Sequence, residues 1–147
     1  MKKLFTMAAL LTAALSMACF TGCAPKPKQI GLQLYSVNQD MGDVEASLQK
    51  VADAGYNVVE TLGSPECFGL PAAEFKALCD SKGIKIVSTH TAIGMDPNDE
   101  EGVMNKWRAV FDGLKTMGAK YCVIPGFGLG SNLEELQGVC DYFNKVG

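Results

Sequence analysis

The sequence has little of what metal enzymes and nucleic-acid-binding proteins rely on. It contains a single histidine, His90, and the four cysteines beyond residue 23 show no CxxC or other metal-ligand spacing, so the sequence gives no sign of a cysteine-based metal site. Its 13 basic and 16 acidic residues give a net charge of -3, so no basic field is available to gather phosphates. We therefore expect no nucleic acid among its partners.

Long hydrophobic runs are also scarce, and the single one lies at the amino terminus. It covers residues 4–18, which is shorter than the roughly 20 residues that a membrane-spanning helix needs. It follows Lys2 and Lys3 and is followed by small residues, the form of a secretory signal. Residues 20–23, Phe-Thr-Gly-Cys, resemble the lipobox of bacterial lipoproteins, in which the cysteine is lipidated and becomes the new amino terminus.

We therefore interpret residues 1–22 as a lipoprotein signal peptide and Cys23 as the lipidation site. Residues 23–29 contain two prolines and are expected to form a stiff tether. The protein is then an exported bacterial lipoprotein, anchored in a membrane and facing the periplasm. Phe20 and Thr21 depart from the usual lipobox residues, so a secretory signal without lipid is the alternative.

From residue 30 onward the chain repeats one pattern of amphipathic helix, glycine, short spacer and apolar strand. The glycines are Gly55, Gly83 and Gly118, each placed where a left-handed residue would end a helix. Alternating strands and helices predict a parallel sheet with right-handed crossovers. We expect strands at 30–37, 58–62, 84–91 and 121–125, with helices beginning near Asp43, at Pro71, after residues 96–101, and at a capping box in 131–134. The last helix is predicted to bury Leu133, Leu136, Cys140 and Phe143.

Polar residues gather at the carboxyl ends of the predicted strands, where parallel α/β folds build their sites. Ser88 and His90 should share one strand face, because side chains alternate along a strand. Glu60 stands among apolar neighbours on a parallel strand, where a carboxylate needs a partner or a ligand. Tyr35 and Gln33 share a face of the first strand. A core role for His90 and simple packing for Tyr35 are the alternatives.

Two other features have structural and functional interpretations that the sequence leaves open. Gly126, Gly128 and Gly130 lie between a strand and a helix, as in phosphate-cradling loops, but their spacing is neither GxGxxG nor that of a P-loop. A flexible loop is the alternative. The four cysteines beyond residue 23 lie mainly in apolar patterns, which is typical of small buried hydrophobic residues, although an oxidising compartment would permit a disulfide.

Four segments together resemble a known family. They are IGLQLYSV at 30–37, AGYNVVE at 54–60, FGLPAAEF at 68–75 and IVSTH at 86–90. In this order they are similar to the sugar phosphate isomerase/epimerase superfamily, the xylose isomerase-like TIM barrels. The resemblance implies that residues 30–147 form the amino-terminal half of such a domain, with about four of the eight (β/α) units of a TIM barrel.

The resemblance also implies a function and its limits. Family enzymes hold a divalent metal with residues from the fifth to eighth strands and move a proton next to a sugar carbonyl. None of those strands is expected here, so we predict no catalytic and no metal-binding residue in this chain. Gln33, Tyr35, Glu60 and His90 are predicted to bind substrate by hydrogen-bonding sugar hydroxyls.

The chain is thus predicted to be an isomerase-like lipoprotein that is inactive alone, with manganese or magnesium required only if the missing half is supplied. A non-catalytic lipoprotein that binds a carbohydrate or a partner chain is the alternative. Expected partners are a small sugar, the membrane through the lipid, and a second copy or a complementing chain, because a half barrel leaves sheet edges unpaired. The related endonucleases for apurinic DNA need several histidines and a cationic face, which this sequence lacks.

Overall fold

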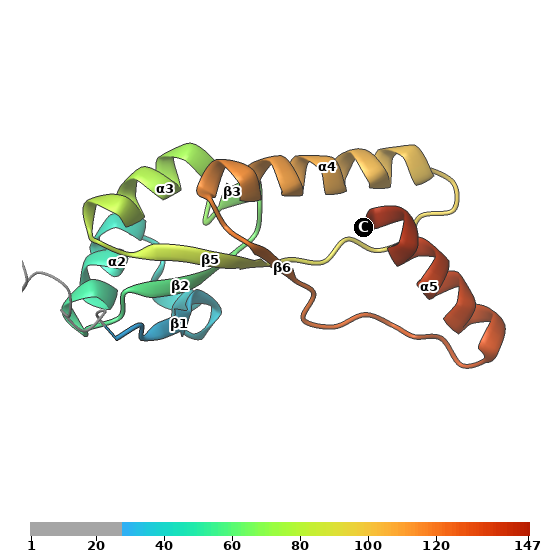
Figure 1. Ribbon diagram of the computed structural model, residues 1–147, viewed down its shortest axis with the longest axis horizontal. Helices are drawn as coiled ribbons and strands as arrows, with labels where there is room; N and C mark the ends of the chain where they lie inside the picture. The colour runs from blue at the N-terminus through green and yellow to red at the C-terminus, as the bar shows by residue number, and fades with distance from the viewer. Residues whose placement is uncertain (1–27) are drawn as a thin grey trace, which may run out of the picture.

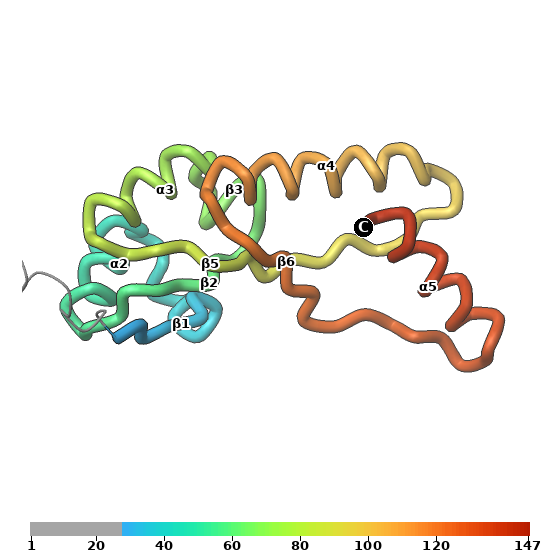
Figure 2. The backbone as a smooth tube through the Cα atoms, in the orientation of Figure 1, coloured from blue at the N-terminus to red at the C-terminus, as the bar shows by residue number. Residues whose placement is uncertain are grey.

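A computed structural model describes residues 28–147 and shows an open parallel sheet with helical connections (Figures 1 and 2). The strands are β1 (Gly31–Gln33), β2 (Val58–Leu62), β5 (Lys85–His90) and β6 (Tyr121–Val123), in the order β1-β2-β5-β6. All neighbouring pairs in this sheet are parallel. This is the predicted set of four (β/α) units and confirms the half-barrel fold class. The described residues do not include the predicted signal peptide, Cys23 or the two prolines of the predicted tether.

Helices α2 (Val44–Asp53), α3 (Ala72–Ser81) and α4 (Glu100–Met117) return the chain to the amino ends of the strands. In Figure 1, α3 and α4 run along the same side of the sheet, with α4 extending past the strand ends. The core between helices and sheet contains fully buried Leu48, Val59, Phe75 and Cys79 together with Trp107, which is 2% exposed. Helix α4 adds Val103, Val110, Leu114 and Met117 to this core, whereas its Phe111 is exposed.

Polar side chains cap α2 and α4 close to the predicted positions. Asp43 accepts a hydrogen bond from the backbone N–H of Ala46, and Gly118 ends α4 with φ 68°, the left-handed geometry expected of a cap glycine. The capping box predicted at 131–134 is wrong by one residue. Asn132 caps α5 (Leu133–Val146) by accepting from the N–H of Glu135.

The first strand was predicted too long. β1 ends at Gln33, and the chain continues in η1 (Leu34–Asp40), a 3-10 helix. Leu34 is fully buried, and the backbone carbonyl of Asp40 accepts a 2.5 Å hydrogen bond from Ser47 Oγ on α2. These contacts fold the segment back over α2, because burying Leu34 does not require an extended backbone. Tyr35 therefore projects from a helical turn rather than from a strand.

The buried face predicted for α5 is right only for Phe143, which is half-buried against the core, whereas Leu133, Leu136 and Cys140 are exposed. The helix buries Val139 and Tyr142 instead, and Leu133 is 84% exposed. Figure 1 shows α5 beyond the carboxyl ends of the strands, away from the sheet and near the amino-terminal half of α4. It is held there by Tyr142, whose ring stacks on Phe127 with centroids 5.6 Å apart. The apolar spacing was correct for a helix, but the face that packs was set by this docking position.

Two short strands, β3 (Glu66–Cys67) and β4 (Leu70–Pro71), form an antiparallel hairpin between β2 and α3. In residues 28–147 the cysteines are free thiols, which leaves the disulfide alternative without support there. No helix in this part of the chain is both long enough and apolar enough to cross a bilayer.

Candidate functional site

Glu60 occupies the centre of a polar cluster that crosses three neighbouring strands. The strand register places Gln33 and Ser88 on either side of it, on β1 and β5. Gln33 Nε2 donates to Glu60 Oε1 at 2.6 Å, and Ser88 Oγ donates to Glu60 Oε2 at 2.6 Å. Each carboxylate oxygen thus has one partner from a different strand. Such charge-assisted bonds are short and fix the orientation of the carboxylate.

His90 lies two residues beyond Ser88 on β5, next to Leu62 of β2 in the register. Tyr35 contacts it from η1, with ring centroids 5.7 Å apart in an edge-on arrangement of 77°. Both ring nitrogens of His90 are buried and have no hydrogen-bond partner. A buried polar atom without a partner costs about 1–3 kcal/mol, so the imidazole is a group that a ligand hydroxyl would stabilise.

The structure joins the four residues predicted to bind substrate in two pairs, Gln33 with Glu60 and Tyr35 with His90. The pairs are neighbours along β5, because Ser88, which bonds Glu60, lies two residues before His90. Sequence reasoning missed Ser88 as a member. It was recognised only as sharing the face of His90, although that alternation together with a neighbouring carboxylate was a usable signal. Thr89 points the other way, as predicted, and donates to the backbone carbonyl of Gly63 at 2.5 Å.

This arrangement is suited to binding hydroxyl groups. An ionised carboxylate offers about four lone-pair sites, and Gln33 and Ser88 use two of them. The remaining sites can accept from ligand hydroxyls, while a neutral imidazole donates from one nitrogen and accepts at the other. The residues of the described chain do not fit a divalent metal, because no group of three metal-ligating side chains occurs among them. No metal-dependent step follows from these residues.

The glycine-rich loop at 126–130 does not form a phosphate cradle. Gly130 has φ 78°, and a Cβ there would lie 2.3 Å from Glu135 Cβ, so close packing against α5 explains this glycine. Glu135 Oε2 also accepts from the backbone N–H of Ser131 at 2.6 Å. The amino terminus of α5 is therefore occupied by a carboxylate of its own chain, which favours the loop interpretation.

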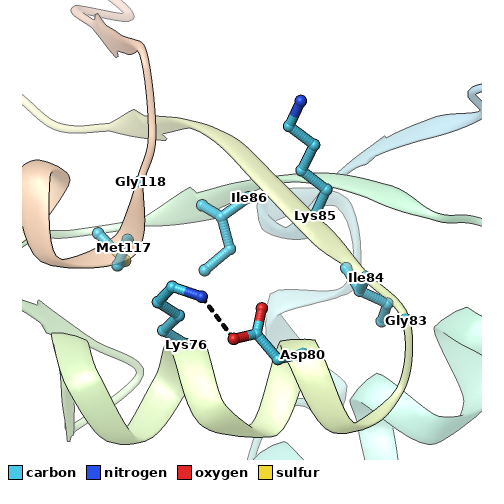
Figure 3. A pocket seen from close by; sticks show the side chains of 8 residues that line it. All are labelled: Lys76, Asp80, Gly83, Ile84, Lys85, Ile86, Met117 and Gly118. Carbon is cyan, nitrogen blue, oxygen red and sulfur yellow. Dashed lines mark hydrogen bonds and ion pairs between the residues drawn. The ribbon is translucent and has the colours of Figure 1, made fainter.

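A separate hollow lies at the amino ends of the strands. It has a volume of about 410 Å³ and is lined by residues of α3, β5 and the turn before β6. Figure 3 shows Lys76 and Asp80 of α3 paired on one side of it, with Ile86 and Met117 nearby. Nearby thiols are poor nucleophiles, since burial raises the pKa of Cys79 to about 12 and also raises that of Cys67. We assign no site to this hollow.

Solved structures with this fold carry related names. A sugar phosphate isomerase/epimerase from Parabacteroides distasonis is 31% identical, with a TM-score of 0.71, over 81% of this chain and 49% of its own. A second such protein from the same organism is 24% identical, with a TM-score of 0.70, over 86% and 48%. A xylose isomerase domain containing protein from Salmonella typhimurium is 18% identical, with a TM-score of 0.53, over 85% and 48%.

The chain therefore spans about half the length of these structures. The 31% identical structure confirms the resemblance to sugar phosphate isomerases/epimerases that four short segments indicated. The two less identical structures support the fold alone. No family profile matches the chain, and no curated protein sequence matches it either.

Proposed function

We propose that this chain supplies a sugar-binding surface of an isomerase- or epimerase-like barrel, and that by itself it binds without turning substrate over. The observation that carries the proposal is the polar cluster of Gln33, Tyr35, Glu60, Ser88 and His90. Its carboxylate is fixed by two 2.6 Å hydrogen bonds from neighbouring strands. The orphaned imidazole nitrogens of His90 provide the matching donor and acceptor.

The role of each residue follows from its contacts. Glu60 accepts from ligand hydroxyls, and Ser88 and Gln33 are positioning residues that act through it. Tyr35 is 58% exposed and packs against the His90 ring in an edge-to-face arrangement. Any proton transfer next to a sugar carbonyl would need acidic groups and a metal of the manganese or magnesium class held by other residues, because the described part of this chain offers no such ligand set.

The test is a titration of the purified chain with neutral hexoses and pentoses, followed by NMR of labelled backbone amides. Binding should shift the signals of β1, β2 and β5 at their carboxyl ends. Glu60→Gln and Ser88→Ala should each weaken binding about 5- to 30-fold, the effect of one or two hydrogen bonds. Ser88→Thr keeps the hydroxyl and should bind better than Ser88→Ala.

A matched control is Asp112→Asn, because Asp112 is exposed on α4 and lies outside the polar cluster. This variant should bind like the unaltered chain. Equal binding by Glu60→Gln and the unaltered chain would refute the proposed surface, and so would shifts confined to the hollow near Lys76. Circular dichroism on each variant separates lost binding from lost folding.

A non-catalytic carbohydrate- or partner-binding lipoprotein is the second candidate. It is favoured by the lack of a metal-ligating cluster in residues 28–147. Assaying sugar isomerisation with and without added manganese or magnesium tests the inactivity that both candidates share. Metal-dependent turnover by the purified chain would rule out the non-catalytic role and the claim that the chain is inactive alone.

For either candidate, we propose an exported lipoprotein held on a membrane through Cys23, with residues 23–29 as tether and the barrel units facing the periplasm. The basic start, the apolar run at 4–18 and the Gly22-Cys23 pair support this localisation. A lipid anchor would keep the polar cluster near the membrane surface without inserting it.

A further inference from the structure

Charge is unevenly distributed between the two ends of the sheet. The segments that follow the carboxyl ends of β1, β2, β5 and β6 are residues 34–43, 63–71, 91–99 and 124–132. None of them contains a lysine or arginine, whereas together they carry five acidic residues, Asp40, Asp43, Glu66, Asp96 and Asp99. Glu60 adds a further carboxylate at the same end. The ten basic residues of the described chain lie in helices, at their ends, or at the amino ends of strands.

The helix amino termini at this end of the sheet also offer little to an anion. A helix amino terminus attracts anions when its N–H groups and its dipole are free to act. Here Asp43, Asp99 and Asn132 cap α2, α4 and α5 with their own side chains. Every first turn of these helices and of α3 also holds at least one glutamate. The amino termini of α2, α4 and α5 are therefore already bonded to carboxylate or amide oxygens, and α3, which has no side-chain cap, carries Glu74 in its first turn.

Two lysines reach the first turns of helices, and both are already paired. Lys82 lies 3.7 Å from Glu45 on α2, and Lys145 lies 2.7 Å from Glu100 on α4. Neither adds net positive charge to the end of the sheet that holds the polar cluster. These two lysines therefore do not offset the carboxylates of the loops at this end.

We propose that the polar cluster takes a neutral, unphosphorylated polyhydroxylated ligand, and that Glu60 disfavours phosphorylated sugars. This inference rests on the proposed function and narrows its substrate class. A phosphate bound here would face a fixed carboxylate and further acidic residues without any basic partner. Neutral hydroxyl groups, by contrast, donate to Glu60 and pair with the free nitrogens of His90.

The test compares neutral and phosphorylated forms of one sugar, using D-fructose with D-fructose 6-phosphate and D-glucose with D-glucose 6-phosphate. Isothermal titration calorimetry measures each affinity at about 20 mM salt, where surface charges are weakly screened, and at about 200 mM salt, where they are strongly screened. The neutral sugar should bind at least about tenfold tighter at low salt, a modest like-charge repulsion at high effective dielectric. The difference should shrink at high salt.

Glu60→Gln removes the charge but keeps a hydrogen-bonding group. It should weaken binding of the neutral sugar. It should also lower the affinity ratio of neutral to phosphorylated sugar about threefold or more, because one repulsive charge is gone. Asp112→Asn removes an equal charge from α4, away from this end, and should leave the preference unchanged. An equal narrowing by both variants would show that net charge rather than Glu60 sets the preference and would overturn the assignment to Glu60.

The outcomes separate the two proposals. If the phosphorylated sugar binds as tightly as the neutral one, or more tightly, the inference fails while the proposed sugar-binding surface stands. If no neutral or phosphorylated sugar binds, the proposed function fails and the inference with it. Tighter neutral binding that depends on Glu60 supports both.

Discussion

Tyr142 is the residue whose change most directly tests how α5 is attached. Its hydroxyl accepts from Trp107 Nε1 at 2.6 Å and donates to the backbone carbonyl of Ile93 at 2.7 Å. Tyr142 is 7% exposed and Trp107 is 2% exposed. This one hydroxyl therefore joins α4, α5 and the segment after β5 inside the protein.

Tyr142→Phe removes the hydroxyl and leaves the ring in place. The variant leaves the indole N–H of Trp107 and the carbonyl of Ile93 without a hydrogen-bond partner. Each such buried group costs about 1–3 kcal/mol. Phenylalanine has no hydroxyl to remove from water on folding, which offsets part of this cost. We therefore expect the free energy of unfolding to fall by about 2–4 kcal/mol. With a denaturant slope of about 1–2 kcal/mol/M, the urea midpoint should fall by about 1–4 M.

Trp107 is the only tryptophan, so its fluorescence reports unfolding without interference. Tyr121→Phe is the matched control, because Tyr121 is 61% exposed and its hydroxyl should contribute less than about 0.5 kcal/mol. If the urea midpoint of Tyr142→Phe equals that of the control, the two hydrogen bonds of the Tyr142 hydroxyl do not hold α5. That result would refute the docking of α5 as described. A large loss for both variants would instead indicate a general effect of removing hydroxyls.

Four further predictions follow from the same structure. Tyr35→Ala should speed the modification of His90, the only histidine, by diethylpyrocarbonate, because it removes the ring that packs against the imidazole. Absorbance at about 240 nm follows the reaction, and an unchanged rate would mean that Tyr35 does not shield His90. Burial raises the pKa of Cys79 to about 12, so iodoacetamide at about pH 8 should label exposed Cys140 and spare Cys79, and equal labelling in peptide mass spectra would contradict this. Cys23→Ser should abolish lipid labelling and membrane retention, and a labelled variant would refute the anchor. Light scattering should show self-association, because a half barrel has two free edges, whereas a cooperative monomer at every concentration would contradict the need for a partner.

The fold was predictable because its local and global signals agree. Glycines placed at helix ends, β-branched apolar runs and polar caps all indicate alternating strands and helices. Gly118 and Asp43 have the predicted cap roles. The failures occurred where the answer depends on docking rather than on local pattern. The buried face of α5 depends on Tyr142 meeting Trp107, a contact between residues that lie far apart in sequence.

The candidate site divides in the same way. A carboxylate amid apolar strand residues predicts a partner or a ligand, which made Glu60 recognisable. The identity of its partners depends on strand register, and that register shifts between Val59 and Glu60. Because a shift of one residue exchanges the faces of a strand, the sequence could not place Ser88 beside Glu60.

The two positioning bonds differ in how securely the sheet supports them. Ser88 is 5% exposed on β5, between β2 and β6, so its bond to Glu60 lies inside the sheet. Gln33 is the last residue of the three-residue strand β1, which has a free edge in the described sheet. A short edge strand frays more readily than an interior one. A chain that pairs with this edge would hold Gln33 against Glu60 and complete the carboxylate's orientation, so edge pairing and ligand binding should strengthen each other.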